Sequence, residues 1–325
     1  MNNFTSQTLL SATHPTPQGR RWIVHPKPRG GHTETAPRES RSLTETIRNA
    51  RAAALPAKLS RSWLLVNAAK EEIFTPAQTS EADSVIFDLE ASVADDKKLE
   101  ARDNVVRALE NGMSAWVRIN KMESEFWDDD LAAVAMLPGL RGVMLPETER
   151  PEQVSYTAMR AKAGLPVLAL LESARGVENA TRIAEAPGTF RLAFGTNDFR
   201  KDTGFSGDPM ALAYARSRLT IASRMGGLPG PIDGPSPADA DDERVWADAE
   251  ATHMMGMTGK LVLTVDQVNT LNEAMSPSED ERDWARQMLE AAEGGSEITD
   301  GSYLPRLARA KKIASLADTY GLWNA

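Results

Sequence analysis

Residues 61–70 read RSWLLVNAAK, in which the apolar run Ser62–Val66 is followed by a turn that contains no glycine. Seven further short runs of aliphatic or β-branched residues follow, and most of them alternate with stretches of helical spacing. Successive runs start 22 to 37 residues apart, which is typical of parallel strands joined by helices. The seven runs are Ser84–Leu89, Ala115–Asn120, Gly142–Pro146, Pro166–Glu172, Arg191–Gly195, Leu228–Asp233 and Gly259–Thr264.

These eight strand–helix units predict an α/β fold, a (β/α)8 TIM barrel over residues 61–276, since that architecture needs about 200 residues or more. The alternative is an open, doubly wound sheet, which would favour a glycine-rich turn after its first strand. The turn reads Asn67-Ala68-Ala69-Lys70 instead, so the barrel is the better prediction. Residues 277–325 are expected to form a C-terminal helical segment.

Residues 1–60 differ in composition from the rest and are predicted to be an N-terminal extension. They hold nine basic and three acidic residues and six of the 19 prolines. The prolines favour an extended arm over residues 1–40, whereas residues 42–54 predict a short helix that Ser42 or Thr44 can cap. The prolines disfavour an amphipathic transit helix, and no apolar run approaches about 20 residues. We therefore expect a cytoplasmic protein without a membrane partner.

Composition narrows the chemistry that the chain can perform. It has no cysteine, which excludes disulfides, thiolate nucleophiles and cysteine-ligated zinc. His253 is the only histidine beyond residue 32, so a catalytic domain that starts at residue 61 has little imidazole chemistry. The net charge of −9 disfavours a nucleic-acid partner. Carboxylate, guanidinium, ammonium and hydroxyl groups remain, together with a hard metal ion held by oxygen.

Acidic side chains gather at the carboxyl ends of the predicted strands, where barrel enzymes carry their active sites. Glu172 and Asp198 are the best metal-binding pair, because each is expected to end an apolar strand and the two strands are consecutive. Neighbouring parallel strands lie about 4.8 Å apart, so both carboxylates can reach one ion. Such a pair suits Mg²⁺, with Mn²⁺ as an alternative. In the competing interpretation the two acids cap the next helices, although Ser173 and Asn197 would serve equally well.

Six short motifs resemble, in the same order, those of the citrate lyase β-subunit-like family, also called the HpcH/HpaI aldolase or CoA ester lyase family. Each motif alone is weak, but six in this order are specific for the family. A stretch over residues 300–310 is similar to the family's C-terminal tail. The motifs are Arg61–Val66, Phe87–Glu90 with Lys98 and Ala101-Arg102 after it, Val117–Asn120, Met144–Pro146, Leu171–Gly176 and Phe194–Phe199.

The resemblance implies a barrel of the phosphoenolpyruvate- and pyruvate-binding type that assembles as a homo-trimer or hexamer. It implies that Glu172 and Asp198 are the Mg²⁺ ligands. It also implies that Arg118 binds substrate oxygens and is catalytic, and that Glu90 lies in the catalytic pocket. In acyl-CoA-cleaving members the tail supplies an acid to a neighbouring subunit, and Asp300 is the candidate for that acid here.

Further substrate-binding residues follow from the same resemblance. Arg61 is expected to help hold the acyl-CoA or keto-acid end of the substrate. The backbone of Gly195, Thr196 and Asn197 is expected to line the pocket, and Lys98 is a weaker candidate for contact with a CoA phosphate.

The implied activity is Mg²⁺-dependent cleavage or formation of a 3-hydroxy-carboxyacyl-CoA, such as citryl-, malyl- or citramalyl-CoA. The partners are then an acyl-CoA and a 2-keto acid. One alternative is a metal-dependent aldolase for free hydroxy-keto acids, which the lack of histidine between residues 33 and 252 disfavours. Another is a non-catalytic metabolite-binding paralogue, which departures from the family pattern at Ala91, Glu147 and Tyr303 motivate.

Overall fold

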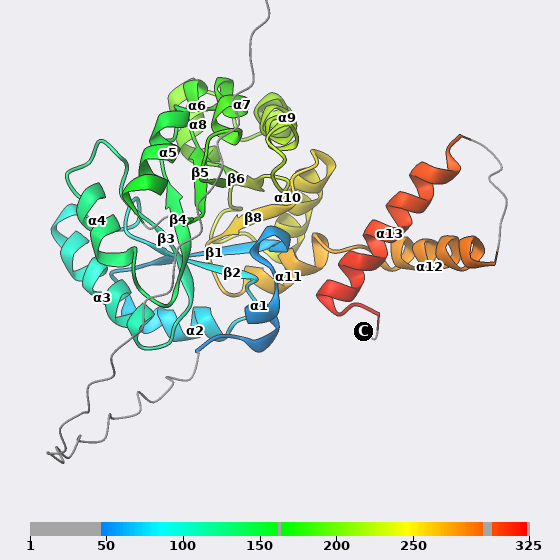
Figure 1. Ribbon diagram of the computed structural model, residues 1–325, viewed down its shortest axis with the longest axis horizontal. Coiled ribbons are helices and arrows are strands. Elements are labelled where there is room, and N and C mark those ends of the chain that lie inside the picture. The colour runs from blue at the N-terminus through cyan, green and yellow to red at the C-terminus, as the bar shows by residue number, and fades with distance from the viewer. Residues whose placement is uncertain (1–46, 162–163, 295–300, 324–325) are drawn as a thin grey trace, which may run out of the picture. The chain divides into compact units, whose positions relative to one another are not determined.

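Eight parallel strands close into a barrel that helices surround (Figure 1). The computed structural model describes residues 47–161, 164–294 and 301–323. The strands pair in chain order, and β8 pairs with β1 to close the ring. The predicted (β/α)8 TIM barrel is therefore confirmed. The strands are β1 Ser62–Asn67, β2 Ser84–Asp88, β3 Ala115–Arg118, β4 Leu140–Leu145, β5 Val167–Leu171, β6 Thr189–Phe194, β7 Ile232–Asp233 and β8 Gly259–Val262.

One helix changes the predicted position of a site residue. β6 ends at Phe194, and residues Thr196–Thr203 form the helix α8, so Asp198 lies in a first helical turn and not at a strand end. The α-helices are α1 Ala50–Ala54, α2 Phe74–Thr79, α3 Lys98–Glu110, α4 Trp127–Val134, α5 Pro151–Arg160, α6 Ala174–Glu178, α7 Ala180–Ala184, α8 Thr196–Thr203, α9 Pro209–Met225, α10 Asp242–Met254, α11 Gln267–Ala274, α12 Glu279–Glu293 and α13 Tyr303–Tyr320.

The interior of the barrel is filled by side chains and is not a channel. The rings of Trp63 and Trp116 meet edge to face, with their centroids 5.4 Å apart. A Cβ on Gly142 would lie 2.2 Å from the Trp116 ring, so glycine is required there for the packing of the ring. Because the interior is closed, a ligand has to bind at the rim formed by the strand ends. The cluster inside the barrel comprises Trp63, Ile86, Trp116, Met144, Leu168, Leu170, Ala193, Ile232 and Leu261.

The C-terminal segment is a pair of helices, α12 and α13. Their contact is apolar and centres on Ala285, Ala310 and Ile313. The far end of α13 touches the barrel, where the hydroxyl of Tyr320 donates a 2.8 Å hydrogen bond to the Leu59 carbonyl. Within the described ranges, no helix is both long and apolar enough to cross a membrane.

The predicted N-terminal extension lies mostly outside the described residues. The described part of the helix predicted over residues 42–54 is α1. The side chain of Asn49 caps α1 by accepting a hydrogen bond from the Ala52 N–H. Ser42 and Thr44, the predicted caps, fall outside the described ranges.

Candidate active site

A buried ion pair between Arg118 and Asp88 lies at the carboxyl ends of β3 and β2, which the strand register places side by side. Nε and Nη2 of Arg118 each lie 2.6 Å from one carboxylate oxygen of Asp88. The same carboxylate accepts hydrogen bonds from the N–H groups of Glu90 and Ser92. Burial disfavours the charged form of Asp88, but Arg118 and these hydrogen bonds outweigh it and lower the pKa of Asp88. The pair is therefore ionised.

Glu90 places a second carboxylate beside the Arg118 guanidinium, with Oε2 at 3.4 Å from Nη1. Burial raises the pKa of Glu90 above its ordinary value, although the charge of Arg118 opposes the shift. The buried ammonium of Lys98 donates to the carbonyls of Leu89 and Glu90, at 2.9 and 2.7 Å. Lys98 thus fixes the loop that carries Glu90, and its ammonium is already engaged there.

Glu172 directly follows β5, and only 7% of it is exposed. Its Oε1 accepts a 2.7 Å hydrogen bond from the N–H of Glu147. The cap of α6 is the neighbouring Ser173, whose hydroxyl accepts from the Gly176 N–H, so Glu172 does not serve as that cap. Burial raises the pKa of Glu172 to about 8, against the opposing effects of the Glu147 N–H and of Arg118. A carboxylate this poorly solvated is stabilised by a cation.

The turn between β6 and α8 lies against Glu172 and leads into Asp198. A Cβ on Gly195 would lie 2.4 Å from Oε2 of Glu172, so only glycine lets the turn approach so closely. Asp198 lies in the first turn of α8, where the helix dipole favours a negative charge. Asp198 is exposed, and its charge contributes to the raised pKa of Glu172. The two acidic residues therefore follow neighbouring strands of the barrel, Glu172 after β5 and Asp198 after β6.

The donor set fits a hard divalent cation. Both donors are carboxylates, and Glu172 has no ion-pair partner among the residues that the structure describes. In the same part of the chain, no group of three or more acidic, histidine or cysteine side chains could hold a metal without other ligands. Mg²⁺ takes one or two carboxylates and fills its other positions with water and substrate oxygens. Glu172 and Asp198 match that requirement.

Of the other predicted site residues, some lie near the carboxylate pair and some do not. Thr196 is buried and Asn197 is exposed, and both lie in the first turn of α8 next to Gly195. Asp300 lies outside the described residues. His253, the one histidine in the described ranges, does not reach this site and lines a cavity near Arg61.

Glu147 orients Glu172, a role that the sequence did not predict. In the sequence, Glu147 is marked only as a departure from the family pattern. With a φ of 46°, it is the single non-glycine residue of positive φ among those described. Such a conformation costs about 1–3 kcal/mol and is found most often at functional sites. In this conformation its N–H reaches Glu172, while its side chain pairs with Lys121 at 3.1 Å. No sequence pattern marks a non-glycine residue for positive φ.

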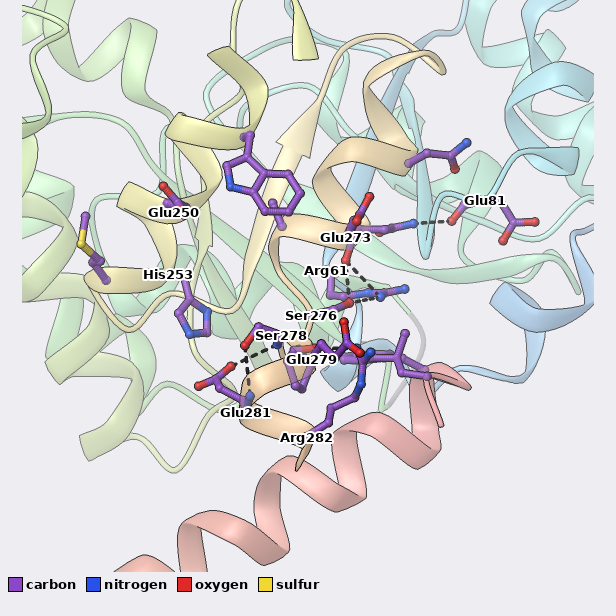
Figure 2. Close-up of a pocket in the computed structure, with 18 of the residues that line it drawn as sticks. Arg61, Glu81, Glu250, His253, Glu273, Ser276, Ser278, Glu279, Glu281 and Arg282 are labelled. Carbon is purple, nitrogen blue, oxygen red and sulfur yellow. Dashed lines mark hydrogen bonds between the residues drawn. The ribbon is translucent and has the colours of Figure 1, made fainter. Parts of the chain in front are cut away.

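Arg61 lies directly before β1, at the amino end of that strand, and its contacts there are structural, whereas its role in substrate binding stays a prediction. Its guanidinium donates to both carboxylate oxygens of Asp83, at 2.8 and 2.9 Å. Figure 2 shows its hydrogen bond to Ser276 within a cavity of about 760 Å³. The ring of Tyr320 lies 3.9 Å from the guanidinium carbon. Residues at the amino ends of barrel strands usually serve stability.

Replacement of Arg61 by methionine is expected to lower stability by about 3–5 kcal/mol, because it leaves the fully buried Asp83 carboxylate without its close partner. Activity per folded molecule should stay within about twofold of the wild type, since Arg61 is remote from the carboxylate pair. Urea denaturation and steady-state kinetics measure the two effects. Arg51→Met is the matched control, because Arg51 is exposed and lies 3.9 Å from Asp83. A selective rise in KM for Arg61→Met would contradict the structural role.

The sequence of the chain has known counterparts. The model of the HpcH/HpaI aldolase/citrate lyase family matches residues 61–264, and that of the HpcH/HpaI aldolase C-terminal domain matches residues 280–321. A (3S)-malyl-CoA thioesterase of Cereibacter sphaeroides is 33% identical over 263 residues, which is 76% of this chain and 90% of the relative. An L-malyl-CoA/beta-methylmalyl-CoA lyase of the same species is 30% identical over 300 residues, covering 80% and 92%.

The fold has a solved counterpart as well. The crystal structure of CitE from Mycobacterium tuberculosis, in complex with magnesium, acetoacetate and coenzyme A, superposes with a TM-score of 0.67 at 27% sequence identity. It covers 80% of this chain and 99% of the CitE chain. Aldolases and citrate lyases both cleave carbon–carbon bonds. On the family match and on these relatives, the chain belongs to the HpcH/HpaI aldolase/citrate lyase family, which is a family of carbon–carbon lyases.

Proposed function

We propose that the protein is a Mg²⁺-dependent lyase that cleaves or forms a 3-hydroxy-carboxyacyl-CoA, such as citryl-, malyl- or citramalyl-CoA. The products of cleavage are an acyl-CoA and a 2-keto acid. The observation that carries the proposal is the placement of Glu172 and Asp198 after the neighbouring strands β5 and β6, at the same end of the barrel as the Arg118–Asp88 ion pair. The relative named as a malyl-CoA lyase and the CitE complex with magnesium and coenzyme A support the same class of substrate.

Glu172 and Asp198 would hold the metal ion, with Mn²⁺ as a substitute for Mg²⁺. When bound, the ion supplies Lewis-acid polarisation of the substrate oxygens. Glu172 is prepared for this role, because its Oε1 is oriented by the Glu147 N–H and its burial leaves the carboxylate in need of positive charge. Gly195 leaves the space on the other side of the same carboxylate.

Arg118 would stabilise the negative charge that develops on the substrate. Asp88 holds two of its nitrogens, so the guanidinium is fixed before the substrate arrives, while Nη1 faces Glu90. A preorganised donor of this kind needs no reorganisation during the reaction. As the carbon–carbon bond breaks, Glu90 takes the hydroxyl proton and the electron pair passes to the thioester enolate. Return of that proton from Glu90 to the enolate carbon gives the acyl-CoA and leaves Glu90 ionised again.

Replacement of Glu90 by glutamine is expected to lower kcat about 10²- to 10⁴-fold, because the amide cannot accept the hydroxyl proton. Mg²⁺ affinity should change little, since Glu90 is not one of the two candidate ligands. Steady-state kinetics and metal titration measure these effects, with Glu100→Gln, an exposed glutamate of α3, as the control. An unchanged kcat would assign the proton transfer to another group, and Asp300 of a neighbouring chain is then the next candidate.

Thioester hydrolysis is the second candidate activity, because a relative that is 33% identical is named a (3S)-malyl-CoA thioesterase. The products distinguish the two reactions. Cleavage of malyl-CoA gives glyoxylate and acetyl-CoA without a free thiol, whereas hydrolysis gives malate and free CoA. The experiment incubates purified protein with malyl-CoA and with citramalyl-CoA, with Mg²⁺ or with EDTA, and assays keto acid and free thiol in parallel. Mg²⁺-dependent release of keto acid supports the lyase, and free thiol without keto acid overturns it.

The assembly is also part of the proposal. We expect a homo-trimer or hexamer in which the C-terminal tail, with Asp300, contributes to the site of a neighbouring subunit. The match of residues 280–321 to the family's C-terminal domain supports this arrangement. A cytoplasmic location fits a CoA ester, since such a highly charged molecule does not cross a membrane unaided. Light scattering coupled to size-exclusion chromatography measures the subunit number.

A further inference from the structure

A second cavity, of about 240 Å³, is bordered by α8, α9, α10, the strand β8 and the loop that follows β7. Four cationic side chains line it: Arg200, Arg216, Arg244 and Lys260. The single acidic side chain in its lining is Asp248, at least among the residues that the structure describes. Glu172 and Asp198 do not line this cavity, whereas Thr196 and Asn197, which are predicted to line the substrate pocket, do, so the cavity adjoins the candidate metal site.

Arg216 is the most informative of these cations, because it is 7% exposed and only partly satisfied. Its Nε and Nη2 face the buried carboxylate of Asp233, at 3.2 and 3.1 Å. Its Nη1 is buried and has no hydrogen-bond partner. A buried guanidinium nitrogen without a partner is costly, so such a group calls for an acceptor that the protein itself does not supply.

Ser236 is a second buried group at the cavity that lacks a hydrogen-bond partner. It is 3% exposed and lines the cavity, and its hydroxyl has no hydrogen-bond partner. Thr196 and Asn197, the first two residues of α8, also line the cavity, and no side chain caps that helix. A helix start adds N–H donors that favour an anion. The cavity thus collects donors from three separate segments of the chain.

Charge in and around the cavity is unbalanced in favour of the cations. Asp233 is shared between Arg216 and Lys260, with Lys260 Nζ at 3.6 Å. Asp248 is paired with Arg244 at 2.9 Å. Arg200 makes no ion pair within the described chain, although its guanidinium lies close to the backbone at Gly207. Two carboxylates therefore face four cations, and an anion of charge −2 would restore the balance.

We propose that this cavity is a binding site for a phosphate group, which the Arg216 Nη1, the Ser236 hydroxyl and Arg200 recognise. Arginine binds phosphate through paired, charge-assisted hydrogen bonds, and a phosphate dianion offers enough acceptors for all three groups. The phosphate is supplied either as the free inorganic ion or as part of a phosphate-bearing metabolite such as CoA. Binding of the free ion does not depend on the proposed lyase activity, whereas the assignment to CoA rests on the proposed function.

The direct test titrates inorganic phosphate into the full-length protein at constant ionic strength, with chloride as the replacement ion, by isothermal calorimetry or ³¹P NMR. Saturable binding to one site per chain is expected. Arg200→Gln should weaken it about tenfold, the value of one charge-assisted hydrogen bond. Arg224→Gln removes another exposed arginine, on α9 outside the cavity, and should leave binding within about twofold. Absence of saturable binding, or equal weakening by both variants, would overturn the proposal.

Two buried serines provide a second matched pair that avoids disturbing Arg216. Ser236 and Ser223 both have unpartnered buried hydroxyls, but only Ser236 lines the cavity. Ser236→Ala should weaken phosphate binding several-fold and Ser223→Ala should not. Competition with CoA and dephospho-CoA then identifies the source. Displacement by CoA alone assigns the site to the CoA 3′-phosphate, and phosphate binding without displacement by either assigns it to a free phosphate. A Ser236→Ala protein that binds phosphate like the wild type contradicts the proposed recognition.

Discussion

Replacement of Glu172 by glutamine is expected to lower Mg²⁺-dependent cleavage of the acyl-CoA substrate about a thousandfold or more. The metal's polarising effect is worth several kcal/mol, and each 1.36 kcal/mol is a factor of ten in rate. Glutamine keeps the size of the side chain and an acceptor for the Glu147 N–H, so the geometry of the turn should persist. Kinetics at saturating substrate over a Mg²⁺ series, with metal affinity from calorimetry, measure the effect.

Asp198→Asn should show the same loss, because the second carboxylate of the pair is removed. Asp202→Asn is the matched control, since Asp202 is an exposed aspartate on the same helix α8 and should leave activity within about twofold. If both Glu172→Gln and Asp198→Asn retain wild-type activity, the carboxylate pair is not the metal site and the proposed mechanism fails. If only one of the two variants retains wild-type activity, the metal is held by a single carboxylate.

Stability measurements separate loss of metal from loss of fold. The folded pKa of Glu172 is raised to about 8, above an ordinary value of 4.5, so the metal-free folded state binds this proton more tightly than the unfolded chain does. The stabilising contribution of the protonated form is complete below about pH 4.5 and is lost as the pH rises toward 8. Glu172→Gln cannot titrate. Its thermal stability in EDTA should therefore fall less than that of the wild type between pH 5 and pH 8.

The barrel was predictable because its strands are nearly continuous apolar runs, which parallel strands buried on both faces require. Even the two-residue strand β7 was marked by the run Leu228–Asp233. The end of β6 was not predictable with equal accuracy, because the run Arg191–Gly195 passes directly into α8 without a side-chain cap to mark the helix start. Asp198 was consequently predicted at the end of a strand, whereas it lies in the first turn of α8.

The contacts between the site residues were harder to predict than the residues themselves. Glu172, Asp198, Arg118 and Glu90 are all visible at or near strand ends in the sequence. Which side chains contact one another depends on the register of the strands. The register sets Asp88 directly beside Arg118 in the neighbouring strand. Register across a parallel pair is fixed by packing far along the chain, so the residues alone do not reveal it.

Arg61 illustrates a different difficulty. The family motif that begins at Arg61 runs the full length of β1, and only its far end is near the active-site rim. Because a strand of six residues is about 20 Å long, a motif at its amino end lies far from the chemistry. The donor role of Glu147 depends on backbone φ and the cavity beside α8 depends on helix packing, neither of which residue identity encodes.

Replacement of Arg118 by methionine is expected to affect stability and activity together. Asp88 is 1% exposed and would lose both of its 2.6 Å ion-pair contacts, so unfolding should become easier by about 3–5 kcal/mol. The loss of a fixed donor for developing charge should lower kcat about 10²- to 10³-fold. Urea denaturation and kinetics on the folded fraction measure the two effects separately.

The double variant Arg118→Met with Asp88→Asn separates the two roles of the arginine. Neutralising Asp88 removes the unpaired buried charge, so much of the lost stability should return. Activity should not return, because the guanidinium that faces the Glu90 carboxylate is then missing. Recovery of both in the double variant would mean that Arg118 serves only to balance Asp88. Recovery of stability alone would identify Arg118 as a group that acts on the substrate, because the fold would then be intact and only the fixed positive charge would be missing.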